Sequence, residues 1–194
     1  MIAGYDGSNY LNDVELVSTQ NNKGFCDPLD LDYTVGNHAS VATDLGILTC
    51  GGYDRINAND YNKCTLETKR GQTISFPSMK KPRSSFGLGI VNDIIFAVAG
   101  GSGLYGAERN MEKINYKTDS NWTLINLPFS VQYPCLTTTK ESLVITGGYQ
   151  YPSGGVSKII LSFVNKNKTL EKINQLQKQI FVFLDILKIF FFIS

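Results

Sequence analysis

The residues of this chain that could carry out acid–base or nucleophilic chemistry are few. His38 is the single histidine of the sequence, so a cluster of histidine ligands cannot form a zinc site. No Gly-x-Ser-x-Gly motif is present to indicate a serine nucleophile. The context Gly36-Asn37-His38 favours a polar turn residue over a general base. The sequence therefore predicts no catalytic residue, no metal site, no cofactor and no enzyme activity.

Four cysteines, at positions 26, 50, 64 and 135, show no close pair and no metal-ligand spacing. We expect them to be small buried or edge residues of strands. Two sequons, Asn121-Trp122-Thr123 and Asn167-Lys168-Thr169, matter only in a secreted chain. No basic segment followed by an apolar stretch opens the sequence, so we expect a cytoplasmic protein, with secretion as the alternative.

The charge balance argues against a nucleic-acid partner. Lys and Arg number 18 and Asp and Glu number 17, which gives a formal net charge of +1 without any basic run. The 18 glycines and the 11% aromatic content favour strands and turns over helices. No 3.6-residue periodicity persists before about residue 162. The composition predicts an all-β protein.

Apolar runs that end in glycine recur along the chain. Complete diglycines stand at Gly51-Gly52, Gly100-Gly101 and Gly147-Gly148, and a degraded copy is Ile2-Ala3-Gly4. The last glycines fall at positions 4, 52, 101 and 148, so the copies are spaced almost evenly. A period near 50 residues is typical of propeller blades.

The third unit is the clearest of these repeats. Strands are expected at 84–91, 94–99, 111–116 and 122–125. Small residues such as Gly87 and Gly89 suit a crowded innermost strand, whereas the apolar run 94–99 suits a strand covered on both faces. Tyr116 and Trp122 stand on either side of a polar turn, where both can pack in the core.

This order of features resembles the Kelch repeat, in which an apolar strand, a diglycine, a loop, a tyrosine and a tryptophan succeed one another. Gly100, Gly101, Tyr116 and Trp122 match the whole pattern. The diglycine alone is matched by Gly51, Gly52, Gly147 and Gly148.

Other positions match this pattern less well. By equal spacing Phe163 takes the tyrosine position of the last unit, and Phe25 takes the tryptophan position of the first. In the second unit Glu67 and Thr73 stand where the two aromatic residues are expected.

The resemblance implies a partial Kelch-type β-propeller of about three to four blades, each a four-stranded antiparallel sheet. It covers residues 1–163, in units of about 1–35, 36–82, 83–132 and 133–163. A closed propeller of six blades would need about 300 residues at this period, so we expect a fragment.

The last segment, 164–194, has a different composition. Phe, Ile, Lys and Asn make up more than half of it, and no glycine or proline follows Gly155. Because these residues have AT-rich codons, translated non-coding sequence is one interpretation, and a packed helix or strand is another. The apolar run 180–193 includes Asp185 and Lys188 and is shorter than the roughly 20 residues of a membrane span, so a membrane anchor is the least favoured.

Kelch proteins typically bind other proteins, so the resemblance implies a scaffold or adaptor that holds a protein partner on its rim loops. The loops that follow the diglycines, at 53–60, 102–110 and 149–155, vary most between units. Tyr53 and Tyr149 recur in phase and are expected to pack. Arg55, Tyr105, Arg109 and Tyr151 are the predicted binding residues. A secreted glycosylated module is the alternative, and an enzyme with a site in the channel is less favoured.

Overall fold

The computed structural model describes the central part of the chain almost throughout. The described residues are 2–5, 8, 10–14, 29–30, 35–54, 56–102, 106–150, 155–156, 160–164 and 169–172. Every regular element among them is a β-strand, which confirms the all-β class. Within these same ranges no helix has the length and apolar character that a membrane crossing requires.

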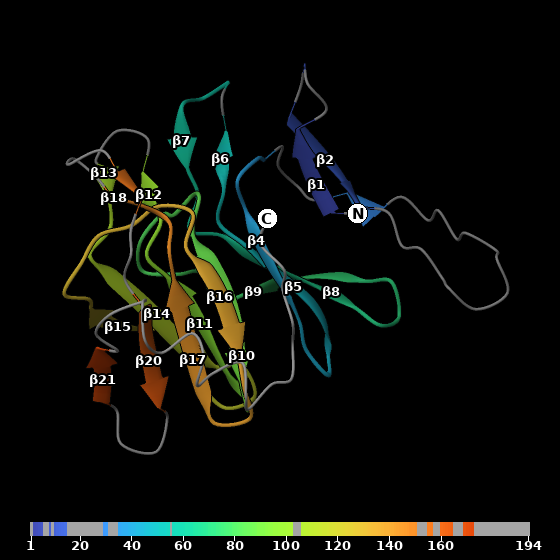
Figure 1. Ribbon diagram of the computed structural model, residues 1–194. Coiled ribbons are helices and arrows are strands. Elements are labelled where there is room, and N and C mark those ends of the chain that lie inside the picture. Colours follow the sequence, from blue (N-terminus) through green and yellow to red (C-terminus); the bar gives the residue numbers. More distant parts are fainter. Residues whose placement is uncertain are drawn as a thin grey trace, which may run out of the picture.

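Four antiparallel sheets follow one another along the chain, and we number them blades 1 to 4 (Figure 1). Blade 1 has the order β1 (Ile2–Tyr5), β2 (Tyr10–Val14), β3 (Leu29–Asp30). Blade 2 has the order β4 (Ala39–Ala42), β5 (Gly46–Cys50), β8 (Cys64–Thr68), β9 (Thr73–Phe76). Blade 3 has the order β10 (Gly87–Val91), β11 (Ile94–Val98), β14 (Asn110–Asn115), β15 (Thr123–Asn126). Blade 4 has the order β16 (Cys135–Thr138), β17 (Ser142–Thr146), β20 (Ile160–Val164), β21 (Thr169–Lys172). The predicted four-stranded blade is therefore confirmed for blades 2, 3 and 4, and three strands of blade 1 are described.

Burial explains the strand order within a blade. In β11, the residues from Ile95 to Val98 are fully buried, because blades cover this strand on both faces. The outermost strand β9 exposes three of its four residues. In the innermost strand β10, a Cβ on Gly87 would lie 2.5 Å from Leu136 Cδ1, so glycine lets blade 4 approach closely.

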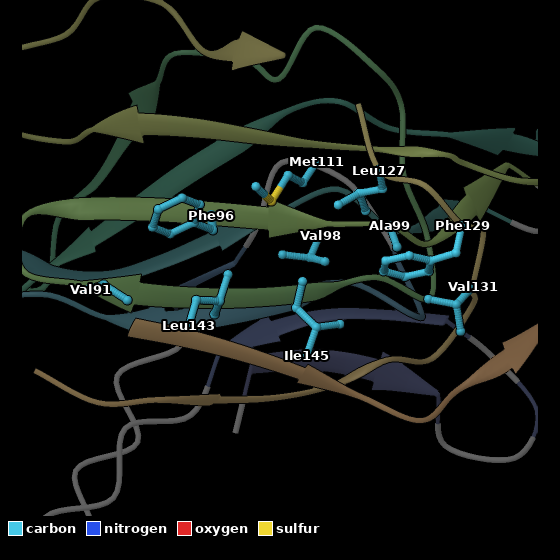
Figure 2. Close-up of a cluster of buried hydrophobic side chains, with 10 residues drawn as sticks. All are labelled: Val91, Phe96, Val98, Ala99, Met111, Leu127, Phe129, Val131, Leu143 and Ile145. Atoms are coloured by element: carbon cyan, nitrogen blue, oxygen red, sulfur yellow. The ribbon is translucent and has the colours of Figure 1, made fainter. Parts of the chain in front are cut away.

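Apolar side chains join successive blades. Between blades 3 and 4, Leu143 and Ile145 of β17 pack with Phe96 and Val98 of β11 (Figure 2). Between blades 2 and 3, Trp122 is 1% exposed and its Nε1 donates a hydrogen bond to the Pro77 carbonyl at 2.7 Å. The core is thus shared between blades, and each blade depends on its neighbour for burial.

The strands repeat at a constant period, and by this period the diglycine of blade 3 lies one residue later than those of blades 2 and 4. Strands β5, β11 and β17 begin at 46, 94 and 142, so the two intervals between them are equal. The two left-handed residues after them are 51–52, 99–100 and 147–148, with φ of 54° at Ala99 and 83° at Gly100. Gly101 therefore does not correspond to Gly52 and Gly148. Ala99 takes the first glycine position of blade 3, which sequence alignment of the glycines alone concealed.

Strand register also corrects two positions of the tyrosine assignment. Ile95 pairs with Ile114, and at the equivalent position of blade 4 Leu143 pairs with Phe163. Phe163 thus corresponds to Ile114 and does not take the position of Tyr116. Glu67, opposite Ile47, corresponds to Ile114 as well. The error has two sources: spacing was counted from Gly101, which does not correspond to Gly52 and Gly148, and the connection before β14 is one residue shorter than the connections before β8 and β20. Phe25 lies outside the described residues.

Cys50 and Cys64 form a disulfide, although the sequence showed no close pair. The two residues are 14 apart in sequence but directly opposite each other on β5 and β8, with their Cα atoms 4.1 Å apart. Both are fully buried. Cys135 is a free and exposed cysteine.

Blade 4 extends beyond residue 163, where sequence analysis placed the end of the repeats. Strand β21 pairs with β20, with Val164 opposite Thr169 and Leu161 opposite Lys172. The four residues of β21 belong to the segment predicted to be an atypical tail. Residues 173–194 lie outside the described part of the chain.

A buried ion pair joins blades 2 and 3. The guanidinium of Arg83 donates to Glu112 Oε1 at 2.9 Å, to the Ala99 carbonyl at 2.9 Å and to the Asn110 side-chain oxygen. Both charged side chains are fully buried. The Arg83 carbonyl accepts the Gly52 N–H of blade 2 at 2.7 Å. One residue therefore binds the diglycine of one blade and the buried strand ends of the next.

The diglycine geometry predicts that Gly52→Ala is strongly destabilising. Gly52 has φ of +105°, and a Cβ there would lie 2.0 Å from Val35 Cγ2. We expect a loss of about 3 kcal/mol or more in the free energy of unfolding. Urea unfolding followed by fluorescence of the single tryptophan measures this. The matched variant Gly71→Ala, with φ of +75° and no atom nearby, should lose only about 1 kcal/mol; equal losses would contradict the steric argument.

Glu67 predicts a pH-dependent stability. Its side chain is buried in blade 2, and burial raises the pKa of its carboxyl above the ordinary value of 4.5, against smaller opposing effects of hydrogen bonds. The folded state then binds the proton more tightly, so stability should fall as the pH rises above 4.5 and through the folded pKa. Glu67→Gln should remove this fall, as seen in urea midpoints at about pH 4.5 and about pH 7.5. The exposed control Glu141→Gln should retain it, and an unchanged slope in Glu67→Gln would refute the assignment.

Because of the ion pair, we expect substitutions of Arg83 and Glu112 to have non-additive effects on the free energy of unfolding. Arg83→Met should cost about 3–5 kcal/mol, because it leaves the Glu112 carboxylate buried and unpaired. Arg83→Met combined with Glu112→Leu should recover part of that loss in the same unfolding measurement. Recovery is incomplete because Glu112 also accepts hydrogen bonds from the Lys80 and Lys81 N–H groups at 2.6 and 2.9 Å. If the double variant lost as much stability as the single variants Arg83→Met and Glu112→Leu lose when added together, the coupling would be excluded.

Candidate functional site

One short hairpin follows each left-handed pair, and these three hairpins form the candidate site. They are β6 (Tyr53–Asp54) with β7 (Asn59–Asp60), β12 (Gly101–Ser102) with β13 (Gly106–Ala107), and β18 (Tyr149–Gln150) with β19 (Gly155–Val156). In Figure 1, β6, β7, β12, β13 and β18 lie above the four-stranded sheets, at one end of the blades. We call this end the rim. The hairpins occupy the three loops that the sequence singled out.

The same backbone bridge anchors each hairpin. Tyr53, Gly101 and Tyr149 pair with the residues Gly36, Ser84 and Gln132, which precede the innermost strands. Each pair exchanges two N–H to carbonyl hydrogen bonds of 2.8–3.1 Å. The three bridges are equally spaced along the chain, so the backbone fixes where each hairpin begins and leaves its tip free to vary in sequence.

A second set of equivalent residues links the blades beside these bridges. Asn37, Ser85 and Tyr133 all have left-handed backbones, with φ of 55°, 53° and 52°. The Tyr133 N–H donates to the Ser85 carbonyl at 2.7 Å, and the Ser85 N–H donates to the Asn37 carbonyl at 2.9 Å. These bonds run from blade to blade at the start of the innermost strands. His38 follows Asn37 directly and is half-buried, just before the innermost strand β4.

The hairpin of blade 2 has an internal hydrogen-bond cluster that sequence analysis missed. The carboxylate of Asp54 accepts bonds from the Ile56 N–H at 2.8 Å, the Asn57 side-chain amide at 2.6 Å and the Tyr61 hydroxyl at 3.0 Å. Burial raises the pKa of this carboxyl, but the side-chain and backbone donors outweigh burial and hold the pKa below its usual value. An Asp followed by Asn three residues later in a turn was the available signal.

The predicted binding residues fall partly within the described chain. Arg109 is exposed, and its guanidinium donates to the Pro128 carbonyl at 3.2 Å. Arg55, Tyr105 and Tyr151 lie outside the described residues. Of the two tyrosines expected to pack, Tyr53 is half-buried, whereas Tyr149 is 46% exposed. Tyr133, which the sequence did not indicate, is 61% exposed.

The opposite end of the blades carries a network of charges. Lys117 lies 2.9 Å from both Asp44 of blade 2 and Asp93 of blade 3, and the Tyr116 hydroxyl donates to Asp44 at 2.7 Å. The bond from Tyr116 is the largest cause that lowers the pKa of Asp44, followed by the contact with Lys117. These groups are partly exposed, and they join the turns of two neighbouring blades. The network gives Tyr116 a structural contact in addition to packing.

The described part of the chain contains no group of side chains arranged to bind a metal ion. There, no three side chains of His, Cys, Asp or Glu gather closely enough to hold an ion. The chemistry available at the rim is that of exposed aromatic, aliphatic, amide and guanidinium groups on rigid backbone supports. Such groups suit binding to another macromolecule.

Comparisons with known proteins agree with the repeats. No family model matches the chain. The chain is 27% identical over 114 residues to Kelch repeat and BTB domain-containing protein 2 of ectromelia virus (strain Moscow), and 30% identical over 115 residues to the protein of that name from cowpox virus (strain Brighton Red). Each match covers 58% of this chain and 20% of the viral protein. The chain thus spans about a fifth of the length of these curated relatives.

A solved structure shows the same fold. The structure of YjhT, a Kelch-type propeller, superposes with a TM-score of 0.71 over 91% of this chain and 65% of that one, at 8% identity. So low an identity supports the fold alone. The constant structural period, the four-stranded blades and these similarities agree with a Kelch-type β-propeller fold, and the repeats are similar to those of Kelch-repeat proteins.

Proposed function

We propose that this chain is a non-enzymatic protein-interaction module, a Kelch-type scaffold or adaptor that holds a protein partner on its rim. The observation that carries the proposal is the set of three hairpins, one in each of blades 2, 3 and 4, which lie at one end of these blades on equivalent backbone bridges. Loops on a rigid scaffold are common recognition sites. The names of the viral relatives, which contain Kelch repeats, agree with such a role.

Exposed side chains at the rim are of the kinds that dominate protein interfaces. Tyr149 lies on β18, Tyr133 lies next to the bridge that anchors this hairpin, and Arg109 follows β13. Tyrosine and arginine are enriched among residues that lose the most binding energy when truncated. Arg55, Tyr105 and Tyr151 remain predictions of the same kind. The absence of a basic patch in the sequence favours a protein partner over nucleic acid.

Two observations favour the secreted alternative. The Cys50–Cys64 disulfide is of a kind that persists in oxidising compartments and is rare in the cytosol. Asn121 of the first sequon is exposed in the turn before β15, where a glycan could be attached. Oxidised thiols together with a glycan on Asn121 in protein from its source cells would establish this alternative. Reduced thiols and an unmodified Asn121 would favour the cytoplasm.

Truncation of rim residues tests the proposed function. Wild-type protein and the variants Arg109→Ala, Tyr133→Ala and Tyr149→Ala would be used to capture partners from lysate of the source organism, followed by quantitative mass spectrometry. A partner identified with wild type would then be purified and titrated. We expect at least one variant to weaken its binding by about 30-fold, equivalent to about 2 kcal/mol.

The matched control is Arg70→Ala, an exposed arginine in the turn between β8 and β9 and outside the rim. It should bind the partner as wild type does. If the rim variants and the control bind equally, the partner does not bind at the rim and the proposal fails.

A further inference from the structure

We propose that Ile56, at the tip of the β6–β7 hairpin, is an anchor residue that inserts into an apolar pocket on the surface of a folded protein partner. The inference rests on the proposed function and specifies one contact within it. It differs from the predictions made for Arg55, Tyr105, Arg109 and Tyr151, because it assigns the central contact to an aliphatic residue.

The exposure of Ile56 sets it apart. Its side chain is 84% exposed, whereas the next most exposed large apolar residue in the described part of the chain is Tyr133, at 61%. Single exposed apolar residues are ordinary on protein surfaces. Exposure alone therefore does not indicate a contact, and the inference depends on how the hairpin holds this side chain.

The Asp54 carboxylate binds the residues on either side of Ala58 in the hairpin. Its four hydrogen bonds come from residues at the tip and beyond it in the chain: the N–H groups of Ile56 and Asn57, the side chain of Asn57, and the Tyr61 hydroxyl. Asp54 is 3% exposed although it lies in a surface hairpin. All four of these donors belong to the hairpin or to the residue that follows it, so the carboxylate stabilises the hairpin and not the contact between blades.

Ala58 shows that this conformation is imposed. It adopts a left-handed backbone with φ of 52°, in a turn position where glycine or asparagine is favoured. A side chain with a Cβ costs about 1–2 kcal/mol there. Such strain persists where surrounding contacts determine the geometry, and it is concentrated at functional sites.

The base of the hairpin is also closed. The disulfide joins Cys50, directly before the diglycine, to Cys64, the first residue of β8 after the hairpin. The Tyr61 N–H also donates a hydrogen bond to the Gly52 carbonyl at 2.9 Å. The equivalent strand pairs are Val98 with Met111 in blade 3 and Thr146 with Ile160 in blade 4. Of the three described hairpins, the one in blade 2 is therefore the one whose base is closed by a covalent bond.

A rigid, protruding aliphatic residue determines the kind of partner that fits it. Because hydrogen bonds to Asp54 already hold Ile56 and Asn57, we expect binding to lose less conformational entropy than it would with an unrestrained loop. A convex tip buries its side chain only in a concave surface, so the partner must offer a preformed apolar pocket. The exposed polar residues Asn57 and Asn59 lie close to Ile56 in the hairpin and can form the hydrogen-bonded edge of the contact.

Photo-cross-linking locates the contact. A benzophenone amino acid would replace Ile56, and in a matched variant it would replace Ile74, which is 47% exposed on outer strand β9 of the same blade. Both variants of the chain would be irradiated in lysate of the source organism, and the cross-linked peptide of the partner would be mapped. We expect a product from position 56 that position 74 does not give, attached to apolar residues that line a pocket of a folded domain.

Binding of the purified cross-linked partner then tests the energetics. We expect Ile56→Ala to weaken binding at least tenfold and Ile74→Ala to change it by less than twofold. Asp54→Ala should accelerate hydrogen exchange at the Ile56 and Asn57 amides and should increase the dissociation rate constant. Ala58→Gly, which relieves the backbone strain, should bind as wild type does.

Four outcomes overturn the proposal. Equal yields from positions 56 and 74 would show that Ile56 is not a preferred contact. Cross-links to an extended peptide would exclude the pocket. An affinity unchanged by Ile56→Ala would exclude an anchor. Placing the same probe at positions 109 and 149 separates the two proposals: products there without one at 56 would overturn this inference and leave the rim proposal intact.

Discussion

The buried contact of Arg83 with Glu112 is the interaction on which the arrangement of blades 2 and 3 depends. A charged pair without solvent is stable only when hydrogen bonds satisfy both groups. Here the guanidinium binds the strand ends of blade 3, and the carboxylate binds the Lys80 and Lys81 N–H groups of the connecting segment. Because the Arg83 carbonyl also holds Gly52, the connection between blades, the diglycine and the base of a rim hairpin share one centre. Val35 and Val131 take the equivalent positions of the neighbouring repeats and are buried without charge.

In each repeat the backbone positions the rim hairpin, and the side chains at its tip vary. The bridges at Tyr53, Gly101 and Tyr149 keep an equal spacing along the chain, although their side chains differ. Main-chain hydrogen bonds need no particular side chain, so tips such as Ile56 can change without moving the support. The rim can therefore diverge to recognise one partner while the blades keep their geometry. Packing limits this freedom where glycines allow close approach, as at Gly52 and Gly87.

The two faces of blade 2 differ in chemistry. On one face, Leu48 and Leu66 pack with blade 3 around Trp122. On the other face, Thr49, Thr65 and Glu67 are buried polar residues. Burial without a countercharge disfavours the ionised form of Glu67, so this face is less stable at neutral pH than an apolar one would be. Blades 3 and 4 place Ile114 and Phe163 at the position of Glu67.

The sequence by itself determined the repeat, the all-β class and the four-strand blade, because apolar runs, glycines and turn residues act locally. It also located the three loops that became hairpins, since these follow the glycines directly. Only the tertiary structure decided which residues meet: the Cys50–Cys64 pair, the Arg83–Glu112 contact, the place of Ala99 in the glycine register and the cluster around Asp54. Each of these joins residues through strand pairing, blade packing or the folding of a hairpin. Connections of unequal length shift such partners in sequence, so spacing in the chain does not reveal them.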